Sequence, residues 1–288
     1  MTKHVVVGID GSPESMAAAR WAGREAAVRG VGLQLLNVWQ APVGSVQFAP
    51  DPEQLRFWEE TRLRDAANEL KERHPSLAVT MEQVAGIPMN VLLEAAATSE
   101  MAVLGSHGLG GISGFLYGSA ALHVLARSDQ PVVLVRADDQ SADPAGAAVV
   151  VGVDLVRPCD GLLTFAFEEA AARNVTLRVV HVWNVYKEYG YAAPALDQRL
   201  AHELRAERAR DLTRLLAPWR AKFDGVEATE TVLDGPVTAG LVEEARHGAA
   251  LLVVGRRRPH GPAAVRIGPV AHGVVHHAPC PVAVVSHA

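Results

Sequence analysis

The chain has 288 residues, of which 49% are hydrophobic and 20% charged, as in ordinary globular proteins with a buried core. Its formal net charge of −5 argues against nucleic acid or an anionic membrane surface as a partner, because both require a basic excess. The two cysteines, Cys159 and Cys280, have no close partner spacing, which argues against a disulfide framework and a thiolate zinc site.

The same features predict a cytoplasmic protein. Two cysteines without a disulfide pattern fit a reducing compartment. The first ten residues enter a strand pattern directly and lack the apolar region and cleavage site of a signal peptide. No run approaches the roughly 20 apolar residues of a membrane span, so no membrane partner is expected.

The first half alternates β-branched apolar runs with helical patterns, which predicts a parallel sheet. The runs lie at about residues 4–9, 32–38, 77–84, 101–105 and 131–136. Right-handed crossovers make such a chain a doubly wound α/β sheet, with helices on both faces and the strand order 3-2-1-4-5. Ligands of this fold bind beyond the carboxyl ends of the strands, so the loops after Asp10 and Gly105 are expected to face each other.

Two helices of the first half have clear signals. Ser12 and Pro13 predict the N-cap and first turn of a helix over residues 14–29. A second helix is predicted over residues 53–73, with its charges on a solvated face. The residues expected to face the core are Ala18, Trp21, Ala22 and Glu25 in the first helix, and Leu55, Trp58, Leu63, Ala66, Ala67 and Leu70 in the second.

The chain repeats itself as two whole domains. Residues 5–10 match residues 149–154 at an offset of 144, and residues 130–135 match residues 280–285 at an offset of 150. A repeat of this length is a tandem duplication, which predicts two five-stranded doubly wound sheets. The expected organisation is a first domain at 1–137, a linker at 138–147 and a second domain at 148–288.

A glycine-rich connection follows the fourth strand, from Gly105 to Gly118, and leads into a helix. Glycines allow backbone N–H groups to approach an anion, and the helix start adds unpaired donors and a positive dipole end. Flexible loops use the same residues, so the loop alone does not establish binding. The chain has no G-x-x-x-x-G-K-[ST] run, and Gly108-x-Gly110-x-x-Ser113 lacks the third glycine of the dinucleotide fingerprint.

The spacing Gly105-x2-Gly108-x9-Gly118-Ser119 resembles the ATP-binding signature of the universal stress protein family, and residues 5–12 resemble its first strand and turn. The resemblance covers both halves and extends to the tandem members of the family. It implies that the first domain binds an adenine nucleotide, ATP with or without Mg²⁺. The nucleotide-binding residues that it implies are Asp10, Val38, Leu104, Gly105, Gly108, Gly118, Ser119 and Ala120.

The resemblance also implies a role for each of these residues. Asp10 would lie by the ribose or phosphates, and Val38 would contact the adenine. Leu104 and Gly105 would line the cleft, and the remaining four would offer backbone and hydroxyl contacts to ribose and phosphates. Cyclic AMP remains an alternative ligand.

The second half departs from this signature. Leu155-Val156 replaces Gly11-Ser12, Arg258 replaces Gly108, and Gly268-Pro269 replaces Gly118-Ser119. These changes bring in a bulky side chain and remove a hydroxyl and an N–H, so the second site is not expected to bind ATP in the family manner. The arginine run 256–258 is interpreted as a solvated loop, with a phosphate grip as the alternative. His272 and His276 have the spacing of metal ligands, but no carboxylate or cysteine nearby completes a set.

Three functions follow from this pattern. The preferred one is a regulatory binding protein whose ligand orders the glycine loop. The second is an enzyme with at most slow ATP hydrolysis or nucleotidyl transfer, because the loop contains no lysine or arginine and Asp10 is the obvious metal-binding carboxylate near it. The third is a nucleotide-free assembly protein. The last strands of the two domains are apolar edge candidates, so an intrachain pseudo-dimer is expected, and a homodimer is left open.

Overall fold

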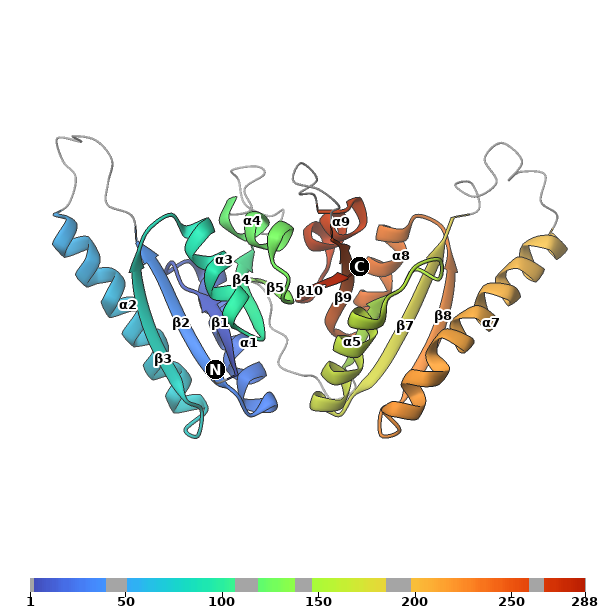
Figure 1. The fold of residues 1–288 in the computed structure, drawn as a ribbon, viewed down its shortest axis with the longest axis horizontal. Coiled ribbons are helices and arrows are strands. Elements are labelled where there is room, and N and C mark those ends of the chain that lie inside the picture. The colour runs from blue at the N-terminus through green and yellow to red at the C-terminus, as the bar shows by residue number, and fades with distance from the viewer. Residues whose placement is uncertain are drawn as a thin grey trace. The chain divides into compact units, whose positions relative to one another are not determined.

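The computed structural model describes residues 3–39, 51–106, 119–137, 147–184, 198–258 and 267–287. The chain divides into two compact units, Met1–Asp139 and Gln140–Ala288, and this boundary falls inside the predicted linker. Each unit is an α/β domain of parallel strands and helices (Figure 1). Within the described residues, no helix combines the length and apolar character that a membrane span requires.

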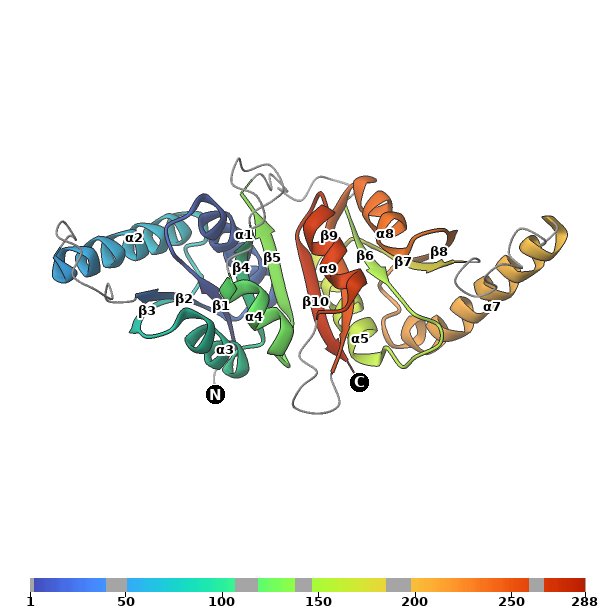
Figure 2. The same cartoon turned by 90° about the horizontal axis from the view of Figure 1, so that it is seen from above.

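In the first unit, the described strands pair in the order β3-β2-β1-β4-β5, and every pair is parallel. Helices α1 and α2 cover one face of this sheet, and α3 and α4 cover the other (Figure 2). The elements are β1 (His4–Gly8), α1 (Pro13–Arg29), β2 (Gly32–Trp39), α2 (Pro52–Arg73), β3 (Val79–Ala85), α3 (Pro88–Thr98), β4 (Met101–Ser106), α4 (Ser119–Arg127) and β5 (Val132–Arg136).

The second unit repeats this topology, with the strand order β8-β7-β6-β9-β10 and parallel pairs throughout. Here α5 and α7 cover one face, and α8 and α9 the other (Figure 2). The elements are β6 (Ala148–Gly152), α5 (Asp160–Arg173), β7 (Thr176–Trp183), α7 (Gln198–Lys222), β8 (Ala228–Asp234), α8 (Val237–Arg246), β9 (Ala249–Arg257), α9 (Pro269–His277) and β10 (Val282–His287).

The α/β class with parallel strands is confirmed. Each strand of the first unit begins and ends within two residues of the bounds predicted from the sequence. The largest shift is at β3, which begins at Val79 because Leu77 belongs to the preceding turn, where its N–H donates to the His74 carbonyl over 3.0 Å. Buried β-branched residues such as Val5 and Val7 fill the layers between sheet and helices.

The predicted core face of α2 is correct for Leu63 and Leu70 but wrong for Trp58, whose side chain is 51% exposed. The residue that reaches the sheet from this part of α2 is its neighbour Glu59, whose Oε2 accepts a hydrogen bond from Asn37 of β2, and Figure 1 shows α2 beginning to one side of the sheet. The side chain of Leu55 lies outside the described residues. All four core residues predicted for α1 are buried.

Both units bury an ion pair in their first helix. In α1 the pair is Glu25 with Arg29, and in α5 it is Glu169 with Arg173, at the offset of 144 found in the sequence repeat. The two helices also end alike, on a residue in the left-handed conformation: Gly30 with φ of 65° and Asn174 with φ of 52°. The duplication therefore preserves the buried ion pair and the helix ending in both units.

Candidate functional site

A tight polar turn joins β1 to α1 in the first unit. One carboxylate oxygen of Asp10, Oδ1, accepts hydrogen bonds from the Ser12 N–H over 3.0 Å and from the Ser12 hydroxyl over 2.6 Å. The Ser12 Oγ in turn accepts from the Ser15 N–H over 3.1 Å, which caps α1 as predicted. Gly11 supplies the turn with a φ of 78°, a conformation that residues with a side chain rarely adopt.

This turn keeps Asp10 ionised. Burial raises the pKa of the carboxyl group, but the hydrogen bonds from the Ser12 hydroxyl and N–H outweigh this effect. The pKa of Asp10 therefore lies below its ordinary value. At neutral pH the turn presents a fixed negative charge at the carboxyl edge of the sheet.

The end of β4 packs directly under the start of α1. A Cβ on Gly105 would lie 2.7 Å from both the Glu14 carbonyl carbon and the Ser15 nitrogen, so the glycine is needed for the helix to approach. The Leu104 side chain is buried and lies against Gly8 of β1. The structure thus brings the end of β4 against the turn after β1 and the start of α1, and Gly105 has a packing role there.

The end of β2 adds a buried amide that the sequence analysis did not identify. Asn37 is 2% exposed, and its Nδ2 donates to the Ile9 carbonyl over 2.8 Å and to Glu59 Oε2 over 3.2 Å. Its Oδ1 accepts from Gln83 Nε2 on β3 over 3.2 Å. These bonds tie the ends of three strands to α2. Val38 follows in β2 and is half-buried, and strand alternation directs its side chain to the opposite face from that of Asn37.

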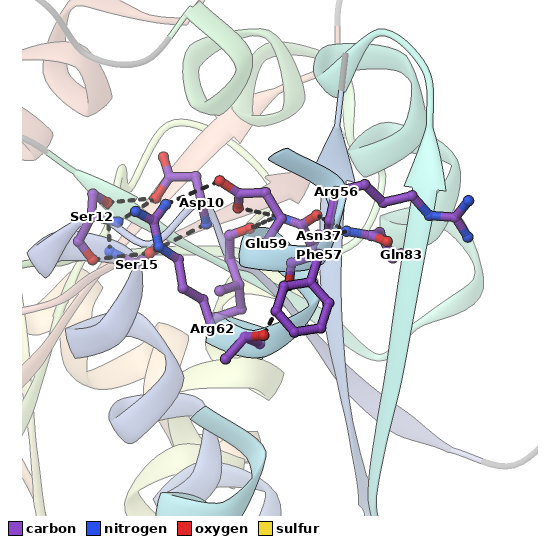
Figure 3. Close-up of polar contacts among 11 residues, drawn as sticks. Asp10, Ser12, Ser15, Asn37, Arg56, Phe57, Glu59, Arg62 and Gln83 are labelled. Carbon is purple, nitrogen blue, oxygen red and sulfur yellow. Dashed lines mark hydrogen bonds and ion pairs between the residues drawn. The ribbon is translucent and has the colours of Figure 1, made fainter. Parts of the chain in front are cut away.

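An arginine from α2 lies over the turn. Arg62 Nη1 pairs with Glu59 Oε1 at 3.0 Å, and the side chain covers Gly11 so closely that a Cβ there would lie 3.0 Å from both Arg62 Cδ and Nη1. Figure 3 shows the Arg62 guanidinium between the Asp10 turn and Glu59. This cation was not predicted from the sequence, because it belongs to a helix whose charges were interpreted as a solvated face.

The phosphate side of the predicted site is described only in part. Gly108 and Gly118 lie outside the described residues. Ser119 is the first residue of α4, and its side chain also lies outside the description. Ala120 is in the first turn of α4 and is half-buried. Of the predicted site residues, the structure therefore describes Asp10, Val38, Leu104, Gly105, the backbone of Ser119, and Ala120.

The corresponding turn in the second unit is built differently. The Val156 N–H donates to Asp154 Oδ1 over 3.0 Å, but the Val156 side chain is 85% exposed and caps nothing. Helix α5 begins at Asp160, three residues later than the position equivalent to Pro13, and Cys159 at its N-cap makes no side-chain capping bond. The capped turn of the first unit is replaced here by a longer, open connection.

A histidine covers the equivalent of Gly105 in the second unit. A Cβ on Gly255 would lie 2.5 Å from His287 Nε2, so the imidazole lies where the first unit places the start of α1. The solvated-loop interpretation of the arginine run is wrong for Arg256, which lies in β9 and is 3% exposed. Arg256 Nη2 and Arg258 Nε each lie 3.2 Å from Ser286 Oγ, which holds both side chains near the ends of β9 and β10.

The second unit keeps the hydrogen bond that joins the end of its second strand to the residue after its first strand. His181 occupies the position of Asn37, and its Nδ1 lies 3.0 Å from the Val153 carbonyl oxygen. A carbonyl accepts only, so His181 carries its proton on Nδ1 in this contact. The bond between the first two strands is conserved, while the charged and capped turn beside it is not.

Comparisons with known proteins agree on one family. A model of the universal stress protein family matches residues 1–136 and 147–286. Universal stress protein Rv2005c of Mycobacterium tuberculosis is 33% identical over 288 residues, covering 97% of this chain and 96% of the relative. Universal stress protein Rv2623 of the same organism is 30% identical over 293 residues, covering 97% and 95%.

A solved structure shows the same fold. The crystal structure of a universal stress protein from Archaeoglobus fulgidus matches with a TM-score of 0.70 at 18% sequence identity, covering 100% of both chains. A structure of Pseudomonas aeruginosa protein PA1789 matches with a TM-score of 0.66 at 17% identity, covering 99% of this chain and 92% of that one. At these identities the likeness concerns the fold.

Proposed function

Because the chain belongs to the universal stress protein family, we propose that it is a regulatory nucleotide-binding protein of the stress response, and that its first unit holds an adenine nucleotide. The observation that carries this proposal is the Asp10 turn. It places an ionised carboxylate beside the end of β4, where the glycine-rich connection begins. This is the edge at which parallel α/β sheets bind their ligands.

The described residues suggest how the nucleotide would be oriented. Both Ser12 hydrogen bonds end on Oδ1 of Asp10, so Oδ2 is the oxygen that would accept a ribose hydroxyl. Val38, half-buried at the end of β2, would contact the flat face of the base. The N-terminus of α4, with Ser119 and Ala120 in its first turn, would direct N–H donors to the phosphates together with Gly108 and Gly118.

Arg62 would complete this site with a cation. Its guanidinium already lies over Gly11 and donates a hydrogen bond to Glu59, from which a phosphate could draw it by a charge-assisted bond. The same cation favours a second candidate function, slow ATP hydrolysis, because it would neutralise charge on a transferred phosphoryl group. Phosphate release over many turnovers, lost in Arg62→Met while ATP still binds, would support that alternative.

The second unit would bind no ATP in this manner. His287 lies over Gly255, and the open turn of residues 154–159 lacks both the cap and the left-handed glycine of the first unit. We include in the proposal a cytoplasmic location, which suits two buried cysteines, Cys159 and Cys280. The intrachain pseudo-dimer stays a prediction, and so does the homodimer, which sedimentation at micromolar concentration tests.

Calorimetric titration of ATP, with and without Mg²⁺, into nucleotide-stripped protein tests the proposal. We expect one site per chain, weakened severely by Gly108→Ala, with AMP, cyclic AMP and GTP as competitors that define the base and phosphate requirements. The absence of binding would contradict the nucleotide assignment and favour an assembly role. Two sites per chain would contradict the degenerate second unit.

A further inference from the structure

Two histidines on α9 direct the same ring nitrogen toward each other. His272 Nε2 and His276 Nε2 are 3.2 Å apart, and the ring centroids are 4.4 Å apart with an interplanar angle of 53°. The His272 side chain is exposed, and that of His276 is half-buried. The pair lies one turn apart on a helix, in a unit that has lost the features of the nucleotide site.

This separation suits two ligands of one metal ion. With Zn–N bonds of about 2.0–2.1 Å, two nitrogens of a tetrahedral site lie about 3.3 Å apart, and two at a right angle about 2.9 Å apart. The observed 3.2 Å falls between these values. Two histidines at i and i+4 on one helical face are also the arrangement that zinc enzymes use for their H-E-x-x-H motif.

The packing of α9 holds the pair toward solvent. Ala271, Val274 and Val275 are buried. A Cβ on Gly273 would lie 2.8 Å from Thr238 Cγ2, so α9 lies close against α8 on that side. The helix is therefore anchored to the unit, and a metal would bind to a face that is already formed.

The repeat provides an internal contrast. At the offset of 150, α4 of the first unit carries Leu122 and Ala126 where α9 carries His272 and His276. Neither residue can bind a metal through its side chain. The histidine pair is thus not a requirement of the fold at this position, because the duplicated helix forms without it.

We propose that His272 and His276 form a bidentate site for a divalent transition metal of the zinc class, with water in the remaining positions. Within the described residues, no group of three or more His, Cys, Asp or Glu side chains could hold a metal ion. A site with two protein ligands exchanges its metal readily. Imidazole nitrogen favours Zn²⁺, Ni²⁺ and Cu²⁺ over the hard ions Mg²⁺ and Ca²⁺, so the site would be separate from any Mg²⁺ that accompanies a nucleotide.

Titration of Zn²⁺ into the metal-free full-length protein tests this proposal. We expect one Zn²⁺ per chain whose affinity falls at least tenfold in His272→Ala and in His276→Ala, and which excess Mg²⁺ does not displace. His277→Ala is the matched control, because His277 is the adjacent exposed histidine of α9 and is expected to leave the affinity unchanged. Circular dichroism shows whether each variant is folded.

A second pair of substitutions tests whether two histidines at these helix positions are enough to create a Zn²⁺ site. Leu122→His with Ala126→His in α4 is expected to add a second Zn²⁺ equivalent to the same protein. Equal Zn²⁺ binding by wild type, His272→Ala and His276→Ala would overturn the proposal. An equal loss in His277→Ala would also overturn it, because the metal would then not require the pair.

Discussion

The turns that follow β1 and β6 descend from one duplicated segment, yet they differ in construction. The first keeps a capped helix start, a left-handed glycine and an ionised aspartate within a few residues of each other. The second keeps the aspartate but begins its helix three residues later, without a side-chain cap. Because strand order and the buried ion pair are the same in both units, the difference concerns the site and not the fold.

The buried ion pairs test whether the two cores are equivalent. Arg173→Met removes the bonded cation from Glu169, which is fully buried, and should lower the free energy of unfolding by about 3–5 kcal/mol. Arg29→Met should cost less, about 3 kcal/mol or below, because the Arg29 side chain is 17% exposed and water can reach the pair. Urea unfolding, with hydrogen exchange read for each unit, measures both. Little loss of unfolding free energy in either variant would contradict the inference that the buried ion pair stabilises both units.

Gly105, near the end of β4, and Gly255, near the end of β9, test whether these two strand ends are packed differently. Gly105→Ala places a Cβ against the backbone of α1 and should destabilise the first unit by about 1–3 kcal/mol. Gly255→Ala would crowd the ring of the His287 side chain and lie at ordinary contact distance, 3.5 Å, from Leu162 Cδ2, so a shift of one side-chain end relieves it and it should cost about 1 kcal/mol or less. Hydrogen exchange of β4 and β9 reports each change. Equal losses would contradict the packing difference.

Arg62 distinguishes the two units in ligand binding, because it lies over the turn of the first unit. Arg62→Met keeps much of the aliphatic packing over Gly11 but removes the charge, and should weaken ATP about tenfold, the equivalent of one charge-assisted hydrogen bond. Arg62→Lys should recover part of this loss. Arg64→Met is the control, because Arg64 lies on the same helix and pairs with Glu60. An unchanged ATP affinity in Arg62→Met would remove Arg62 from the site.

The pKa of Asp10 predicts the smallest effect, a pH dependence of stability. A carboxyl group whose pKa is lower in the folded state stabilises the protein above its unfolded pKa of about 3.9, and this contribution is lost as the pH falls through the folded value. The stability difference between wild type and Asp10→Asn should therefore be constant near neutral pH and shrink below about pH 4. Urea midpoints measured from pH 7 to pH 3 test this. A difference that grows on acidification would contradict the lowered pKa.

The sequence predicted the architecture well because its signals are local and repeated. β-branched runs marked the strands, Ser12 and Pro13 marked the start of α1, and the offset of 144 marked the second copy. Trp58 was misplaced because helical spacing alone does not reveal which side of α2 meets the sheet near its start, where Glu59 and not Trp58 reaches β2.

The site was harder to predict because its parts come from separate elements. Asn37 is an ordinary polar residue in the sequence and acquires its role only when β2 ends beside Ile9 and Glu59. Arg62 is one of several charges on α2, and only the fold places it on Gly11. A polar residue at a buried strand position is the one signal that could have identified Asn37 in advance.

The proposed function requires that the first unit binds the nucleotide and that the second does not. The most direct test is ATP titration of the matched variants Asp10→Asn and Asp154→Asn, which make the same change at the same position of the repeat. We predict that Asp10→Asn weakens the single site severely and that Asp154→Asn leaves its affinity and stoichiometry unchanged. Loss of binding in Asp154→Asn, or its retention in Asp10→Asn, would contradict the assignment of the site to the first unit.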